Sequence, residues 1–110
     1  MQAKRIAFLA REAALDKKAE DPVILDVAKL TSVANYFFVT HGNSARQVRA
    51  IAQHIMDTFR SLKVPVWHVE GMEEGRWVLL DYGGVLAHIF YRETRAFYGL
   101  ERLWGEAKKL

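Results

Sequence analysis

The stretch "WVLLDYGGVLAHIFY", residues 77–91, decides how the second half of this chain folds. Two apolar runs lie on either side of the pair Gly83-Gly84. Glycine accepts the positive φ angles that tight turns need, so the pair predicts a β-hairpin with strands over 76–82 and 85–91. Any sheet in this chain is therefore expected to contain an antiparallel pair at this hairpin.

Both faces of the first hairpin strand are apolar. Side chains alternate between the faces of a strand. The first face holds Trp77, Leu79 and Asp81, and the opposite face holds Val78, Leu80 and Tyr82. One face must meet the core of the domain, and the other requires cover, either from the terminal helices of the same chain or from a partner molecule.

The composition is that of one small folded domain. With 110 residues, of which 51% are hydrophobic, the chain fits a single domain over residues 1–110. A body of this size can cover one patch on a larger assembly but has little volume for a deep cofactor cavity, and no cofactor is expected. The chain contains no cysteine, which excludes disulfides, thiolate nucleophiles and zinc sites with cysteine ligands.

The charge pattern is mixed. Sixteen basic and 13 acidic residues give a net charge of +3, and the two signs are interspersed. Proteins that bind nucleic acid through its phosphates usually show a dense basic stripe, so the composition permits a contact with RNA without requiring one. No apolar run is long enough for a signal-peptide core or a membrane span. We expect a cytoplasmic protein with no membrane contact.

Helical and strand patterns fill the rest of the chain. Apolar spacing predicts a first helix over 2–18, which ends at "AEDP" because the residue before a proline disfavours helix. Ser44, followed three positions later by Gln47, predicts a capping box at the start of a central helix. The apolar stripe of that helix runs through Val48, Ile51, Ala52, Ile55, Phe59 and Leu62. The other predicted elements are strands at 23–28, 36–41 and 64–70, and a last helical segment at about 93–107 with a break near Gly99.

This order of elements predicts the fold class. The central helix connects two strands, which implies one parallel pairing, and the hairpin adds antiparallel ones. We expect an α/β (α+β) domain with a five-stranded mixed sheet and helices packed on it.

The turn "GNS", residues 42–44, raises an enzymatic alternative. Backbone N–H groups at a helix N-terminus can hold a phosphate, and Arg46 is close by in the sequence. A P-loop needs a longer glycine frame with Lys-Ser/Thr, and a dinucleotide fingerprint needs three spaced glycines. Neither is present, so plain capping by Ser44 is the simpler interpretation. A nucleotide-binding or nucleotidyltransferase-like enzyme that uses this turn is the alternative function.

No catalytic or metal-binding constellation accompanies that turn. Phosphoryl or nucleotidyl transfer needs carboxylates that converge on Mg²⁺, but Asp26 and Asp81 occur singly on separate predicted strands. The histidines show neither i, i+4 spacing on a helix nor a His-Glu-x-x-His motif; they are His41, His54, His68 and His88. "GNSAR" is not a Gly-x-Ser-x-Gly nucleophile elbow. We therefore expect no catalytic residue, no metal ligand and no enzyme activity.

Aromatic residues concentrate in the last third of the chain. They are Trp77, Tyr82, Phe90, Tyr91, Phe97, Tyr98 and Trp104. Tryptophan and tyrosine are typical anchors of protein–protein interfaces. This concentration favours a binding surface over an active site.

Two long blocks carry a resemblance to a known family. The first is "LDVAKLTSVANYFFVTHGNSARQVRAIA" (25–52), and the second is "VEG" (69–71) followed by "WVLLDYGGVLAHIFYRETRAFYGLERLW" (77–104). Over about residues 23–107 the chain resembles the ribosomal silencing factor family, also called the Iojap-like proteins. The resemblance implies a fold similar to nucleotidyltransferases but without their catalytic carboxylates, which agrees with the missing Asp-x-Asp pair.

The resemblance also implies a function. Family members bind the large ribosomal subunit at its intersubunit face, on the fourteenth large-subunit ribosomal protein. They thereby block joining of the small subunit and lower translation when nutrients are short, as in stationary phase. Free members form homodimers, which extends the expectation of a homodimer to this chain.

Two positions depart from the family pattern. The family usually has Asp where this chain has Asn35, and Asp where this chain has Gly84. Both changes remove a negative charge, which puts in doubt any contact that those carboxylates would make.

Residues of the second block are the expected contacts with the ribosomal protein. From the hairpin these are Trp77, Leu79, Asp81, Tyr82, His88 and Phe90, and from the C-terminal part they are Tyr98 and Trp104.

Overall fold

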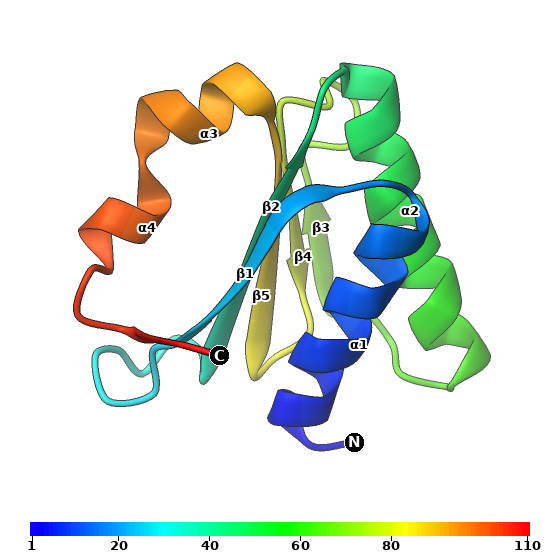
Figure 1. The fold of residues 1–110 in the computed structure, drawn as a ribbon. Coiled ribbons are helices and arrows are strands. Elements are labelled where there is room, and N and C mark those ends of the chain that lie inside the picture. The colour runs from blue at the N-terminus through cyan, green and yellow to red at the C-terminus, as the bar shows by residue number, and fades with distance from the viewer.

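The computed structural model describes residues 1–110 and arranges them around one central sheet (Figure 1). The helices are α1 (Ala3–Asp16), α2 (Ala45–Ser61), α3 (Arg92–Tyr98) and α4 (Leu100–Leu103). The strands are β1 (Glu20–Asp26), β2 (Tyr36–Gly42), β3 (His68–Glu70), β4 (Trp77–Asp81), β5 (Val85–Tyr91) and β6 (Lys108–Lys109). None of the four helices combines the length and the apolarity that a membrane crossing requires.

The sheet is mixed, as expected, but it has six strands in the order β3-β4-β5-β2-β1-β6, so the expectation of five was wrong. β2 and β5 pair in parallel, and every other pair is antiparallel. The additional strand is β6, which aligns Lys109 with Leu25 and Lys108 with Asp26 of β1. Two lysines carry no strand signal of their own, so this pairing was not visible in the sequence.

Several element boundaries differ from the prediction. The strand expected over 64–70 is confined to His68–Glu70, because the N–H of Val64 bonds to the carbonyl of Phe59 and closes α2, and Pro65 has no N–H to give. The segment expected over 93–107 divides into α3 and α4 at Gly99, where φ is +56°. The break near Gly99 was therefore predicted at the right residue.

Helices α1 and α2 cover one face of the sheet, which we call the helix side (Figure 1). The predicted stripe of α2 is buried there from Val48 to Phe59, whereas Leu62, its expected last member, is exposed. The buried face of α1 is mostly alanine, namely Ala7, Ala10, Ala13 and Ala14. Small side chains let the helix lie close to the sheet, where Ile24, Phe38 and Ile89 complete the larger of two apolar cores.

The opposite face, which we call the outer side, carries a smaller core. Its buried members are Leu25, Val27, Ala34, Phe37, Val39 and Phe90. Leu100, Trp104 and Ala107 pack on them, so α3, α4 and the segment that follows lie over β1, β2 and β5 (Figure 1). The terminal helices therefore cover part of this face, while Leu79 and Asp81 on β4 remain partly exposed.

Candidate docking surface

Trp77 forms the centre of an aromatic cluster on the outer side. It begins β4, and its ring lies 4.8 Å from that of Phe90 and 5.0 Å from that of Tyr98, measured between centroids. Its Nε1–H donates a hydrogen bond of 3.1 Å to Nδ1 of His88. The side chain is half-buried, so it joins the sheet to α3 while part of the indole faces solvent.

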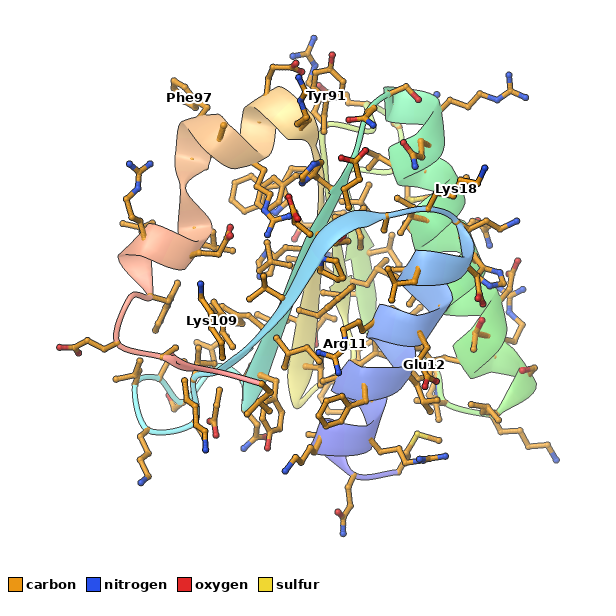
Figure 2. The ribbon with its side chains drawn as sticks, viewed as in Figure 1. Arg11, Glu12, Lys18, Tyr91, Phe97 and Lys109 are labelled. Carbon is orange, nitrogen blue, oxygen red and sulfur yellow. The ribbon has the colours of Figure 1, made fainter.

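The cluster extends from a buried floor to an exposed rim. Phe37, His88 and Phe90 form the floor, and Trp104 packs edge-on against Phe37 with centroids 5.1 Å apart. Phe97 and Tyr98 on α3 are 80% and 51% exposed, and Phe97 points away from the body of the protein (Figure 2). We call this set the outer aromatic surface: Phe37, Trp77, Leu79, Asp81, His88, Phe90, Phe97, Tyr98 and Trp104.

A cleft opens in this surface beside Trp77. Its volume is about 460 Å³, and Tyr91, Phe97 and Tyr98 line it together with Trp77. Arg76, Glu74 and Glu93 add charged groups to its wall. The cleft therefore offers aromatic faces bounded by polar groups, which is the usual anatomy of a site that receives a side chain of another protein.

His88 is a structural member of the surface. Only 6% of the residue is exposed, and burial lowers its pKa to about 4, because the low-dielectric interior disfavours the charged ring. Since Nδ1 accepts from Trp77, the neutral ring carries its proton on Nε2, which has no hydrogen-bond partner. His88 thus orients the indole above it and is not placed to act as a base.

Leu79 and Asp81 lie at the uncovered end of the surface. Asp81 accepts a 2.8 Å hydrogen bond from the N–H of Gly83, so its carboxylate stabilises the hairpin turn. On β3, Glu70 pairs with Leu79, and His68 pairs with Asp81. The partly exposed Leu79 therefore has polar side chains beside it.

Tyr82 was wrongly assigned to this surface. It lies on the helix side, only 5% exposed, with its ring centroid 4.7 Å from that of Phe59. Burial raises its pKa to about 12, and its hydroxyl has no hydrogen-bond partner. The alternation along β4 already separates Tyr82 from Trp77, so the correct face could have been read from the strand pattern.

Sequence reasoning missed two members of the surface. Phe37 could have been found from the alternation in "YFFVT", which puts Phe37 and Phe38 on opposite faces of β2. Phe97 has no such signal, because its exposure depends on how α3 lies against the sheet.

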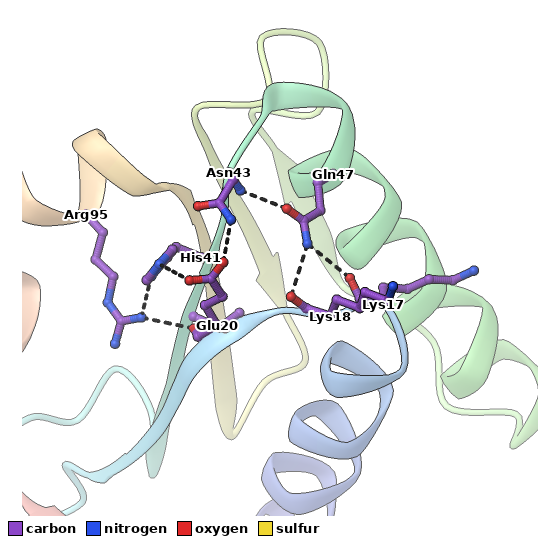
Figure 3. A network of polar contacts seen from close by, with 8 residues as sticks. Lys17, Lys18, Glu20, His41, Asn43, Gln47 and Arg95 are labelled. Carbon is purple, nitrogen blue, oxygen red and sulfur yellow. Dashed lines mark hydrogen bonds and ion pairs between the residues drawn. The ribbon is translucent and has the colours of Figure 1, made fainter.

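The "GNS" turn is occupied by contacts within the chain (Figure 3). Oγ of Ser44 accepts the N–H of Gln47 at 3.0 Å, which confirms Ser44 as the N-cap of α2. The amide of Gln47 accepts from the N–H of Asn43 at 2.8 Å and donates to the carbonyls of Lys17 and Lys18. The reciprocal bond of the predicted capping box therefore goes to Asn43 rather than to Ser44, and side chains of the turn already bind the N–H groups of Asn43 and Gln47.

The two aspartates considered as metal ligands, Asp26 and Asp81, each accept a hydrogen bond from a nearby backbone N–H instead. Oδ1 of Asp26 accepts the N–H of Ala28, and Oδ1 of Asp81 accepts that of Gly83. No group of three or more histidine, aspartate or glutamate side chains is arranged to hold a metal ion.

The two departures from the family pattern are neighbours in space. The N–H of Asn35 donates to the carbonyl of Gly84 at 2.8 Å. A Cβ at Gly84 would lie 3.1 Å from Oδ1 of Asn35 and 2.8 Å from Cβ of Ala3. Glycine at this position therefore lets the start of α1 approach the hairpin turn.

Comparison with known proteins identifies one family that matches this chain in sequence, and similar solved structures share its fold. The family profile "Ribosomal silencing factor during starvation" matches residues 1–110. "Ribosomal silencing factor RsfS" of Bacillus subtilis (strain 168) is 45% identical over 107 residues, which are 97% of this chain and 91% of that protein. "Mitochondrial assembly of ribosomal large subunit protein 1" of Mus musculus is 29% identical over 91 residues, 80% of this chain and 40% of that protein. A crystal structure of a Chromobacterium violaceum protein matches with a TM-score of 0.92 at 39% identity, covering 96% of this chain and 88% of that one. The chain belongs to the ribosomal silencing factor family, RsfS.

Proposed function

We propose that this protein binds the large ribosomal subunit through the outer aromatic surface and thereby prevents the small subunit from joining. The observation that carries the proposal is Trp77, a half-buried tryptophan at the centre of an aromatic cluster on the sheet face that α1 and α2 leave open. A repressor of this kind needs affinity and position, and no chemical step.

Family membership supports a silencing role, and two further observations support the large subunit as the partner. The mouse relative is named for the assembly of the large subunit of the mitochondrial ribosome. The resemblance of the hairpin block to the family points to the fourteenth large-subunit ribosomal protein, and the cleft beside Trp77 suits a side chain of a protein partner.

The size of the protein suits a steric mechanism. Its principal extents are 34 × 34 × 21 Å, so a molecule seated on the intersubunit face would separate the two subunits by more than the length of any side chain. A specific interface buries on the order of 1,200–2,000 Å² in total, which the outer side of a sheet of this size can supply.

The test is sedimentation with purified ribosomal subunits. We expect the wild-type protein to migrate with the large subunit and to lower the yield of joined ribosomes. Trp77→Ala should weaken binding roughly 30-fold, since a central tryptophan anchor is typically worth ~2 kcal/mol or more. Tyr98→Ala, at a more exposed position, tests the same surface with less effect on the hydrogen bond to His88.

Leu15→Ala is the matched control, because Leu15 is an exposed apolar residue on α1, away from the outer side. Circular dichroism establishes that each variant is folded. Migration of the wild-type protein with neither subunit would refute the proposal, and unchanged affinity of folded Trp77→Ala would remove Trp77 from the interface.

The same proposal includes a homodimer of the free protein and a peripheral contact with ribosomal RNA. Sedimentation equilibrium without ribosomes measures the first. The second predicts that affinity for the large subunit falls modestly as salt rises, because few phosphates are neutralised.

A further inference from the structure

A second cluster of polar groups lies where α3 meets β1 and β2, and its central residue is Arg95. The guanidinium is buried, and its Nε and Nη2 donate to the two carboxylate oxygens of Glu101 at 3.2 and 3.0 Å. Nη1 donates to the carbonyl of Glu20 at 3.3 Å and lies 2.9 Å from Nδ1 of His41 (Figure 3). One side chain of α3 therefore binds α4, β1 and β2 together.

The contact between Arg95 and His41 requires a neutral histidine. A guanidinium has donors only, so Nδ1 of His41 must accept, and the ring proton is on Nε2. That nitrogen lies 3.7 Å from Oε1 of Glu20. Burial, and next the charge of Arg95, lower the pKa of His41 below its usual value, while Glu20 opposes them.

Charged groups of three elements face this histidine. Arg95 and Arg92 come from α3, and Glu20 and Asp21 come from β1. Glu101 of α4 reaches the cluster through its paired bonds to Arg95. Burial alone would raise the pKa of Glu101, but the hydrogen bonds and charge of Arg95 lower it, so the carboxylate stays ionised and available to Arg95.

The segment that Arg95 holds is otherwise lightly anchored. α3 has seven residues and α4 has four, and the two meet at the left-handed Gly99. Phe97 and Leu103 are largely exposed and Tyr98 is half exposed. Apolar contact with the sheet rests on Leu100, Trp104 and Ala107 and on the contact of Tyr98 with Trp77. A segment with little buried apolar area depends more than others on its polar contacts and opens locally at low cost.

We propose that Arg95, Glu101, Glu20 and His41 form a latch that holds α3 and α4 in the arrangement the outer aromatic surface needs, and that protonation of His41 opens it. The role of the latch in docking rests on the proposed function; its opening does not. A proton on Nδ1 would face the N–H groups of Nη1, which opposes two donors and two positive charges at 2.9 Å. Arg95 would then leave β2, and Tyr98 and Trp104 would lose their fixed positions against Trp77 and Phe37.

Hydrogen exchange of the full chain tests the latch without ribosomes. Between pH 7.5 and 5.0, after correction for intrinsic exchange rates, we expect protection of amides in 92–104 to fall at least tenfold relative to amides of α2. His41→Gln keeps an acceptor but cannot be protonated, so its protection should not depend on pH. Glu101→Gln should lower protection of this segment at both pH values.

His54→Gln is the matched control, since His54 pairs with Asp16 between α1 and α2 on the helix side. It should retain the full pH response of α3 and α4. Unchanged protection in the wild-type protein, or an equal pH response in folded His41→Gln, would overturn the latch. Should His41→Gln not fold, His41→Asn and the wild-type titration decide the matter.

Sedimentation with the large subunit at pH 7.5 and 5.0, the range of the exchange experiment, separates this proposal from the previous one. Binding that weakens at pH 5.0 in the wild type, but not in His41→Gln, supports both. A pH-dependent exchange response without binding at any pH keeps the latch and refutes the proposed function. Binding that is equally strong at both pH values, with a normal exchange response, refutes the role of the latch in docking.

Discussion

Gln47 shows how much a single side chain can decide. Its amide oxygen accepts from the N–H of Asn43, just before α2, and its amide nitrogen donates to the carbonyls of Lys17 and Lys18 at the end of α1. Gly42 leaves the space for it, because a Cβ there would lie 3.1 Å from Oε1 of Gln47. Two helices from distant parts of the chain are therefore joined through one amide.

Gln47→Glu should destabilise the protein, although a carboxylate near a helix N-terminus is normally favourable. The substitution places an anion against two carbonyl oxygens and removes both donated bonds, which costs about 1–3 kcal/mol. Urea unfolding should rank Gln47→Glu below Gln47→Ala, which loses the bonds but adds no repulsion. The opposite ranking would show that the helix dipole dominates at this position.

His88 predicts a pH dependence of stability. Its pKa is about 4 in the folded protein and about 6.5 when unfolded. Because the folded protein binds this proton less readily than the unfolded chain, the free energy of unfolding is unaffected above pH 6.5 and falls as the pH drops toward 4. The total loss is about 3 kcal/mol. Urea unfolding of the wild type and of His88→Leu across this range should show the smaller slope in the variant, and equal slopes would contradict the assignment.

At the scale of elements, the long periodic segments were predictable and the short ones were not. α2 and the hairpin follow from apolar spacing and turn residues, because their own side chains form the pattern. β6 depends on pairing with β1, and the shortened β3 depends on how α2 ends, so neither is encoded in its own residues. Tertiary contacts decided both.

Replacing Gly99 by a residue with a Cβ should destabilise the protein, even where the new residue favours helix. The φ of Gly99, +56°, is left-handed, so Gly99→Ala should lower the free energy of unfolding by about 1 kcal/mol despite the better helix propensity of alanine. Gly105→Ala is the comparison, since Gly105 has no positive φ. Equal thermal stability of Gly99→Ala and wild type would mean that α3 and α4 can merge into one continuous helix without the break at Gly99.

At the scale of the whole molecule, the two faces of the sheet differ in how they are covered: α1 and α2 cover the helix side, and α3, α4 and the segment after them cover part of the outer side. Alternation along the hairpin strands predicted the division between the faces. Tyr82 lies on the helix side, and His88 and Phe90 are buried beneath the outer side. Which part of that face stays uncovered could not be predicted, because it depends on the path of the chain after Tyr91. The proposed partner rests on family resemblance, because no property of the residues alone identifies it.

Tyr82 and Tyr98 should respond in opposite ways. Tyr82→Phe removes a buried hydroxyl without a partner, so it should raise stability by about 1 kcal/mol and leave binding to the large subunit unchanged. Tyr98→Ala should weaken binding and change stability little, because Tyr98 is half exposed. Thermal unfolding and subunit sedimentation on both variants test the division, and weaker binding of folded Tyr82→Phe would contradict it.

The parallel pairing of β2 with β5 has a consequence for how the protein comes into being. Tyr36 aligns with Val85 and Gly42 with Tyr91, so the middle of the sheet joins residues almost fifty positions apart. Contacts of such long range slow folding, because the intervening chain loses the entropy of loop closure before the contacts can stabilise the sheet. Phe37 meets His88, with ring centroids 5.1 Å apart, only at that step, so the hairpin alone lacks part of the floor of this surface. The outer aromatic surface is thus incomplete in a newly made chain until β5 and the segment that follows it have been synthesised.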